Sequence, residues 1–119
     1  DAGRTAEQLA ALRQAIDTCD VAADARNDYA YLRATSSDPG VRDGAEALRI
    51  AGAIVAAHPD RPDYLDTLAC AHAATGDFGQ ATRLADRALT MLEGRLPPEI
   101  VAIYRQHRDA FAAGRAIEE

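Results

Sequence analysis

The chain has 119 residues, and 48% of them are hydrophobic, which suffices for one domain with its own core and no disulfide or metal support. The formal net charge is -6, because nineteen acidic residues outnumber thirteen basic ones, all of them arginine. This balance argues against nucleic-acid binding, which needs clustered cations to neutralise phosphates. Scarce aromatic residues and abundant alanine favour helices over strands.

Neither a membrane segment nor a metal site is predicted. The longest apolar stretch, residues 50–57, is much shorter than the roughly twenty residues that cross a bilayer, so we expect no membrane insertion. Cys19 and Cys70 are too few and too far apart for a zinc site or a disulfide framework, so we expect no metal and no cofactor. The compartment stays open between cytoplasm and periplasm. A start at Asp1, without methionine or a signal-peptide pattern, predicts a processed protein or a soluble piece of a longer one.

The first two predicted helices lie before residue 36. A capping box from Thr5 to Gln8, followed by leucines at helical spacing, predicts a helix over residues 5–20. A second apolar stripe begins at Val21, includes Tyr29, and ends at the polar turn signal of residues 36–40.

Four further helices are predicted in the rest of the chain. The third begins at Asp43 and ends at His58-Pro59, since proline cannot continue the hydrogen-bond ladder. The fourth ends at Gly76-Asp77 and the fifth near Gly94. The sixth starts at Pro97-Pro98. Its predicted apolar stripe consists of Ile100, Ile103, Tyr104, His107 and Phe111.

The third and fifth predicted helices superpose with a shift of 34 residues. Asp43 falls on Asp77, Ala47 on Ala81, and Arg49-Ile50-Ala51 on Arg83-Leu84-Ala85. A period of about 34 residues in helix-turn-helix units is typical of tetratricopeptide repeats.

The residues from Tyr64 to Ala69, followed by Ala73 to Phe78 and Ala81 to Leu89, resemble the tetratricopeptide repeat (TPR) family. A bacterial subtype of this family is resembled by the combination of residues 28–32, 34–36, 42–44 and 65–69. The resemblance implies an all-α, right-handed superhelix of helix-turn-helix repeats with about six helices. The expected organisation is one domain over residues 1–119. Its parts are a leading half-repeat or capping helix (5–20), a first repeat (21–58) with an inserted loop (36–42), a second repeat (61–94) and a C-terminal capping helix (97–114).

In a superhelix of this family the first helix of each repeat lines a concave groove. The resemblance therefore implies partner-binding positions at Asp24, Asn27, Tyr31, Asp63, Asp66 and Cys70. Such a groove is acidic and suits a basic or amphipathic peptide or helix, with Tyr31 as a rigid anchor. The alternative is that Asp24, Asp63 and Asp66 only stabilise the first turns of their helices.

The third predicted helix is apolar nearly all round, and Gly52, Ala53 and Ala56 lie where its polar outer face would be. Something is expected to cover this surface: the inserted loop over residues 36–42, or a second copy of the chain. The second possibility makes the protein a self-associating structural module, which is the alternative to a partner-binding scaffold.

No catalytic constellation is predicted. His58 is interpreted as a helix-end residue, and His72 and His107 as packed core histidines. Cys70 and His72 are two residues apart on a helix, so their side chains point to different faces. The sequence thus predicts a non-catalytic protein-protein interaction scaffold, part of a larger bacterial protein or complex, with a frayed tail at residues 118–119.

Overall fold

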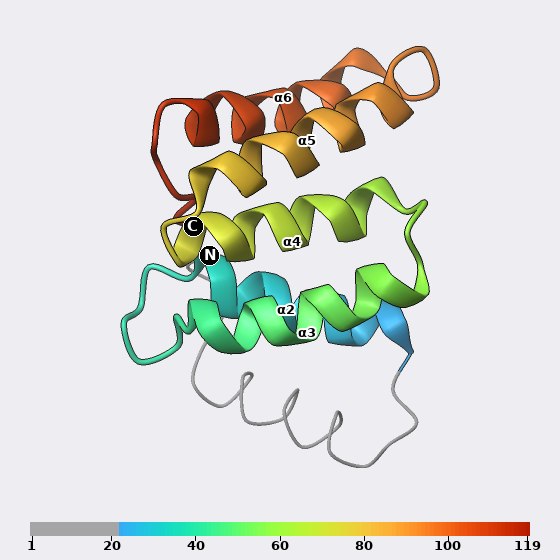
Figure 1. Ribbon diagram of the computed structural model, residues 1–119. Coiled ribbons are helices and arrows are strands. Elements are labelled where there is room, and N and C mark those ends of the chain that lie inside the picture. The colour runs from blue at the N-terminus through green and yellow to red at the C-terminus, as the bar shows by residue number, and fades with distance from the viewer. Residues whose placement is uncertain (1–21) are drawn as a thin grey trace.

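The computed structural model describes residues 22–119, and this part of the chain is all-helical, with no strand. It contains five helices, shown in Figure 1: α2 (Ala23–Thr35), α3 (Gly44–Ala57), α4 (Pro62–Ala74), α5 (Phe78–Leu92) and α6 (Pro98–Ala112). These match the second to sixth predicted helices, whereas the helix predicted over residues 5–20 and Cys19 lie outside the described residues. Between residues 22 and 119, none of the helices has both the length and the apolar character needed to cross a bilayer.

The helix ends follow local signals. Asp43 caps α3 by accepting a hydrogen bond from the Glu46 amide at 3.0 Å, and Asp77 caps α5 by accepting one from the Gln80 amide at 3.1 Å. After α4, Gly76 has a φ of 90° and the Asp77 amide donates to the His72 carbonyl, the pattern of a Schellman motif. The two aspartate caps stand in the same 34-residue register that the sequence predicts.

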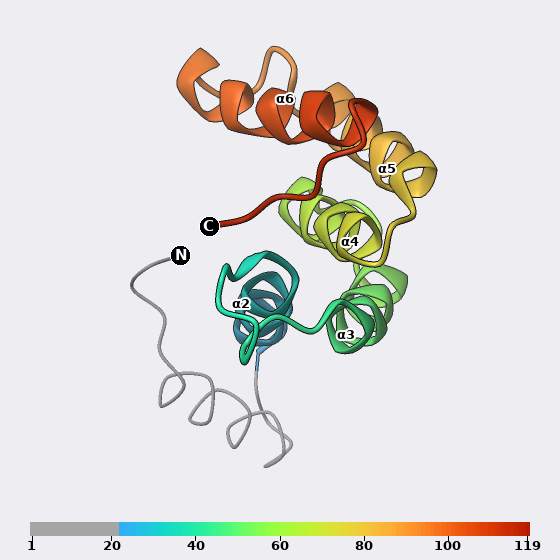
Figure 2. The same ribbon diagram turned by 90° about the vertical axis from the view of Figure 1, so that its left-hand side faces the viewer.

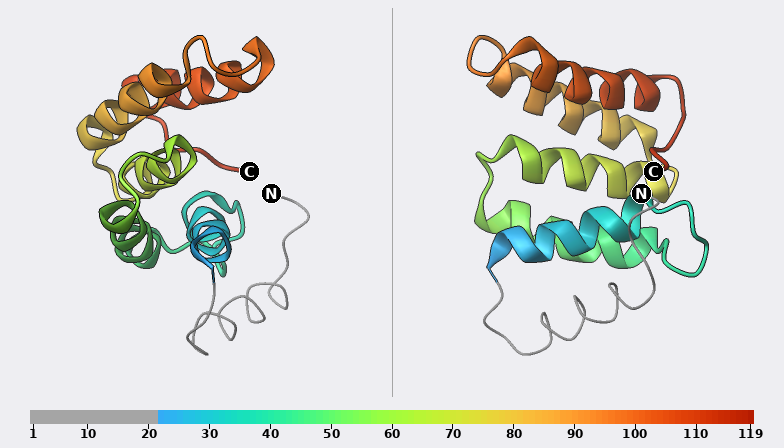
Figure 3. Two further views of the ribbon diagram at one scale, coloured as in Figure 1. Left: turned by 90° about the vertical axis from the view of Figure 1, so that its right-hand side faces the viewer. Right: turned by 180° about the vertical axis from the view of Figure 1, so that it is seen from behind.

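The helices form two rows. Helices α2, α4 and α6 make one row, in which α4 contacts both α2 and α6. Helices α3 and α5 make the other row, where α3 packs on α2 and α4, and α5 packs on α4 and α6. Figures 2 and 3 show this arrangement along and across the helix axes. The last residues of the chain run back from α6 past α4 toward α2, beside the first row (Figure 2).

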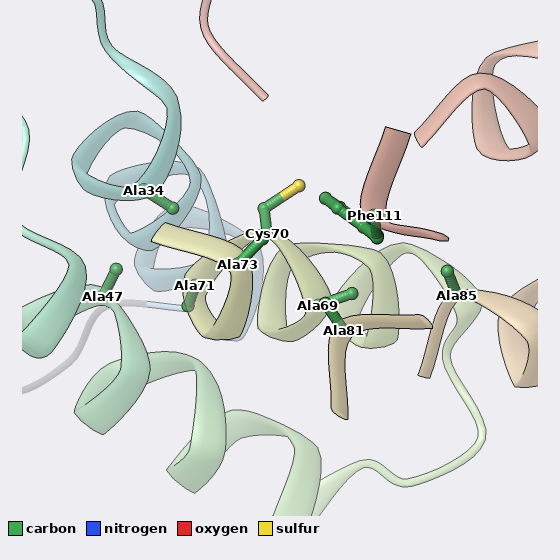
Figure 4. Packing of buried hydrophobic residues seen from close by; sticks show 9 residues of the cluster. All are labelled: Ala34, Ala47, Ala69, Cys70, Ala71, Ala73, Ala81, Ala85 and Phe111. Atoms are coloured by element: carbon green, nitrogen blue, oxygen red, sulfur yellow. The ribbon is translucent and has the colours of Figure 1, made fainter. Parts of the chain in front are cut away.

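Helix α4 is the centre of the core because it is the one described helix that contacts all four others. Nearly every residue of α4 from Tyr64 to Ala73 is buried. The core around it is built of small side chains, which let the helices approach closely. Figure 4 shows this cluster: Ala34, Ala47, Ala69, Cys70, Ala71, Ala73, Ala81, Ala85 and Phe111.

The start of α3 lies very close to the end of α4, and Gly44 makes this approach possible. A Cβ at Gly44 would lie 3.1 Å from the Ala74 Cβ and 3.2 Å from the Ala74 carbonyl carbon, whereas a Cβ at Gly52 would have no atom within 4 Å.

This difference predicts opposite effects for two identical substitutions. We expect Gly52→Ala to raise the free energy of unfolding by roughly 0.5–1 kcal/mol, since alanine loses less entropy than glycine in a helix. Gly44→Ala should cancel that gain or lower stability, because the backbone of Ala74 must shift. Urea denaturation followed by circular dichroism measures both, and an equal gain at the two positions would contradict the close approach.

Candidate binding groove

A cavity of about 340 Å³ opens between α2, α4 and α6. Four of the six predicted partner-binding residues line it: Asn27 and Tyr31 from α2, and Asp63 and Asp66 from α4. Asp28 adds a further carboxylate from α2. The amide oxygen of Asn27 is buried and accepts no hydrogen bond from the residues between 22 and 119, so it can accept one from a ligand or water. We call this cavity the groove.

Asp24 does not line the groove. It links the start of α2 to the start of α4. Its carboxylate accepts hydrogen bonds from the Tyr64 hydroxyl at 2.5 Å and from Arg61 at 3.2 Å, and Arg61 also donates to Asp63 at 2.8 Å. The Tyr64 hydrogen bond and the Arg61 charge lower the pKa of Asp24 below its usual value. Arg61 therefore neutralises part of the predicted acidity at this end. These pairs are solvent-exposed, so they contribute little to stability.

Asp66 lines the groove from a buried position and is paired with His107 of α6. Both residues are 8% exposed, and the His107 Nδ1 lies 2.9 and 3.0 Å from the two carboxylate oxygens of Asp66. Burial lowers the pKa of His107, but the hydrogen bond and the charge of Asp66 outweigh it, so the pKa is raised above its usual value. The Tyr31 ring stacks on the His107 ring at a centroid distance of 6.5 Å. Asp66 thus joins α4 to α6 rather than standing free for a partner.

Cys70, predicted to face the groove, is instead buried in the core at 1% exposure. Burial, with the nearby charge of Asp66, raises the pKa of its thiol well above the usual value. The thiol is therefore protonated and weakly nucleophilic at neutral pH. The placement at Cys70 was wrong because α6 covers this turn of α4, a contact that no local pattern reveals.

Helix α6 supplies groove residues that the sequence analysis assigned only to an apolar stripe. Val101, His107 and Phe111 are its buried positions, whereas Ile100 and Ile103 are 41% and 50% exposed and line the groove. Tyr104 also lines it, and burial raises the pKa of Tyr104 to about 12. The sequence did carry a signal for these groove residues: the apolar stripe of this helix is too wide to be buried on a single packing face.

The C-terminal residues, predicted to be frayed, run back from α6 to the end of α2 (Figure 2). The Glu119 amide donates to the Thr35 carbonyl at 2.7 Å, and the Glu119 carbonyl accepts from the Ser37 amide at 3.1 Å. The Tyr31 hydroxyl donates to the Glu119 carboxylate. Arg42 donates to the Ile117 carbonyl at 3.3 Å. The segment 115–119 is thus an extended peptide held by α2 and the loop.

The loop over residues 36–42 does not cover the outer face of α3. It packs Val41 inward and holds the C-terminal residues, while Ala53 and Ala56 are exposed and Gly52 is half-buried. The expectation that the loop folds over these residues was wrong, because the polar groups of the loop bond to Arg33 and to the C-terminal residues instead.

A second cavity, of about 430 Å³, lies between the α3–α4 connection and the end of α5. It is larger and mainly apolar, with Met91, Leu92 and Leu96 among its lining residues. None of the predicted site residues lines it, and its two charged lining residues are Asp60 and Arg95.

Comparison with known proteins gives no identification. The chain matches no family model, no curated protein and no solved structure. The function therefore has to be argued from the groove itself.

Proposed function

We propose that this chain is a TPR-like repeat module without catalytic activity that binds a peptide or helix of a partner protein in the groove between α2, α4 and α6. The observation that carries the proposal is the composition of the groove. One wall presents the carboxylates of Asp28 and Asp63, and the opposite wall presents the exposed Ile100 and Ile103. A basic, amphipathic segment complements both walls.

The helix contacts support a repeat. In a repeat array each unit contacts only its neighbours, and the first helices of successive units stack in one row. Here α2, α4 and α6 stack in that way, while α3 and α5, which would be the second helices, each pack between two members of the row. The matching caps at Asp43 and Asp77 mark equivalent starts of these second helices.

The chain's own C-terminal residues support peptide binding. They run extended beside α2, and their backbone is held by the carbonyl of Thr35, the amide of Ser37 and the side chain of Arg42. Backbone hydrogen bonds of this kind bind an extended peptide with little dependence on its sequence. The groove thus lies next to a surface that already binds one extended peptide segment, the C-terminal residues of the chain itself.

The test uses peptides, because the natural partner is unidentified. A random peptide library displayed on phage is selected against the full chain, and the Kd of the best peptide is measured by fluorescence anisotropy. We expect enriched peptides to combine arginine or lysine with apolar residues. The double variant Asp28→Arg/Asp63→Arg should weaken binding by about tenfold or more, since like charges then face each other.

A control double variant, Glu93→Arg/Asp109→Arg, changes the net charge equally at exposed positions outside the groove. It should leave the Kd within about threefold of the original value, since salt screens the interaction between the peptide and charges that lie far from the groove. Equal weakening by both double variants would show a nonspecific charge effect and overturn the proposal. Selection of no peptide, or peptides that ignore the groove variant, would overturn it as well.

A further inference from the structure

Three metal-binding side chains converge between α4 and α6. Asp66 and Cys70 stand four residues apart on one face of α4, and His107 reaches them from α6. One donor atom from each residue lies within 4.8 Å of the other two. The Cys70 Sγ is 4.0 Å from the His107 Nδ1, and the nearer Asp66 oxygen is 2.9 Å from the same nitrogen. Figure 4 shows the Cys70 side chain pointing out of α4 on the side of Phe111 in α6.

This geometry does not suit a catalytic cysteine. In a cysteine-histidine pair one ring nitrogen serves the thiol while the other is held by an orienting group. Here the thiol and the carboxylate both approach Nδ1. When Nδ1 carries a proton it donates a hydrogen bond to Asp66, so this nitrogen has no free lone pair with which to deprotonate Cys70. The convergence of three donors on one point is instead what a cation requires.

We propose that Asp66, Cys70 and His107 bind a zinc ion, or a similar thiophilic divalent cation, between α4 and α6. Zinc takes thiolate, imidazole and carboxylate ligands at about 2.0–2.3 Å in tetrahedral geometry, which places ligand atoms roughly 3.3–3.7 Å from one another. The observed separations, from 2.9 Å to at most 4.8 Å, bracket that range, so side-chain movements of about an ångström bring the three donor atoms into coordination.

The charges balance in the bound state. Binding releases the thiol proton of Cys70 to solvent and requires His107 to ligate through an unprotonated Nδ1, with its one ring proton on Nε2, so that the imidazole is neutral. One thiolate and one carboxylate then neutralise the two positive charges of the ion, and a neutral buried centre avoids most of the cost of burying charge. Without the ion, the carboxylate disfavours the thiolate, and the cation reverses this effect.

The three protein ligands leave one coordination position. Tyr31, which stacks on His107, and Glu119, which is bonded to Tyr31, are the nearby polar groups. The negative charge of Glu119 acts on both Cys70 and His107, while Arg42 provides an opposing positive charge near Cys70. A water molecule completes the tetrahedron, and the ion crosslinks α6 to the central helix.

The test is a titration of the full, metal-stripped chain with Co²⁺, whose absorption spectrum reports tetrahedral geometry and thiolate ligation. We expect one Co²⁺ per chain with a thiolate charge-transfer band, and displacement of Co²⁺ by Zn²⁺. Cys70→Ala should abolish the band. His107→Gln should weaken binding at least about 100-fold, since even residues that only support metal ligands change affinity 10–100-fold.

Two matched controls separate this site from adventitious binding. Cys19→Ala removes the other cysteine of the chain, and His72→Gln removes a histidine that lies on α4 but outside the proposed site. Both should keep the band and the affinity. If the helical circular dichroism spectrum shows that a variant is unfolded, the proposal is tested instead by the thermal unfolding of the original chain. Zn²⁺ should raise the Tm of that chain by several degrees. Absence of both the band and the thermal shift would overturn the proposal, as would loss of the band in Cys19→Ala.

Discussion

Phe111→Ala is expected to lower the free energy of unfolding by about 4 kcal/mol, within the range for removing a buried aromatic side chain. Phe111 is 1% exposed and anchors α6 on the central cluster. Its neighbours there include Cys70, Ala81 and Ala85, whose side chains are too short to collapse into the space left behind. The cavity should therefore persist, which places the effect toward the upper part of that range.

The matched control is Ile103→Ala on the same helix. Ile103 is 50% exposed and faces the groove, so its removal should change stability by less than about 0.5 kcal/mol. Guanidinium denaturation of the three proteins measures both effects. Peptide binding should fall in both variants, in Phe111→Ala because the α6 wall is displaced and in Ile103→Ala because an apolar contact is lost. Similar stabilities for the two variants would contradict the anchoring role of Phe111.

Arg33→Met is expected to cost about 3 kcal/mol, because truncating one member of a buried ion pair leaves the other charge poorly compensated. The Arg33 side chain is 11% exposed and lies 2.8 Å from the Glu46 carboxylate, whose side chain is 13% exposed. Arg33 also donates to the Val41 carbonyl at 2.9 Å, inside the loop. Its loss therefore affects the α2–α3 contact and the loop together.

Arg49 provides the control, since it lies 3.7 Å from the same Glu46 carboxylate but its side chain is 73% exposed. Arg49→Met should cost less than about 0.5 kcal/mol. In a double-mutant cycle, Glu46→Gln should cost much less in the Arg33→Met background than in the original chain, since the pair is coupled. Additive effects of the two substitutions, measured by urea denaturation, would contradict the coupling.

The helices and their 34-residue register could be predicted from the sequence because the interactions that determine helix ends are local. A capping side chain such as Asp43 bonds an amide three residues away, and prolines such as Pro62 and Pro98 start a helix by their own fixed φ. The 34-residue shift follows because equivalent helices carry equivalent caps. These features explain why all five helices between residues 22 and 119 were predicted.

The groove was predicted only in part. Asn27, Tyr31 and Asp63 line the groove, because helical periodicity, once the family resemblance selects a face, locates residues along that face. Asp66 lines the groove but is paired with His107, and Cys70 is buried, because both lie under α6. The angle at which α6 crosses α4 decides this, and no spacing within one helix encodes it.

The sequence by itself thus determined the helical class, the helix limits and the aspartate caps of α3 and α5, all of which depend on interactions within about four residues. Only the tertiary structure decided which side of α6 is buried, that Asp66, Cys70 and His107 meet, and that Glu119 lies against Tyr31. These contacts join residues 37 to 88 positions apart. The packing of whole helices sets them, and in such packing a rotation of one helix by a single position exchanges an exposed side chain for a buried one.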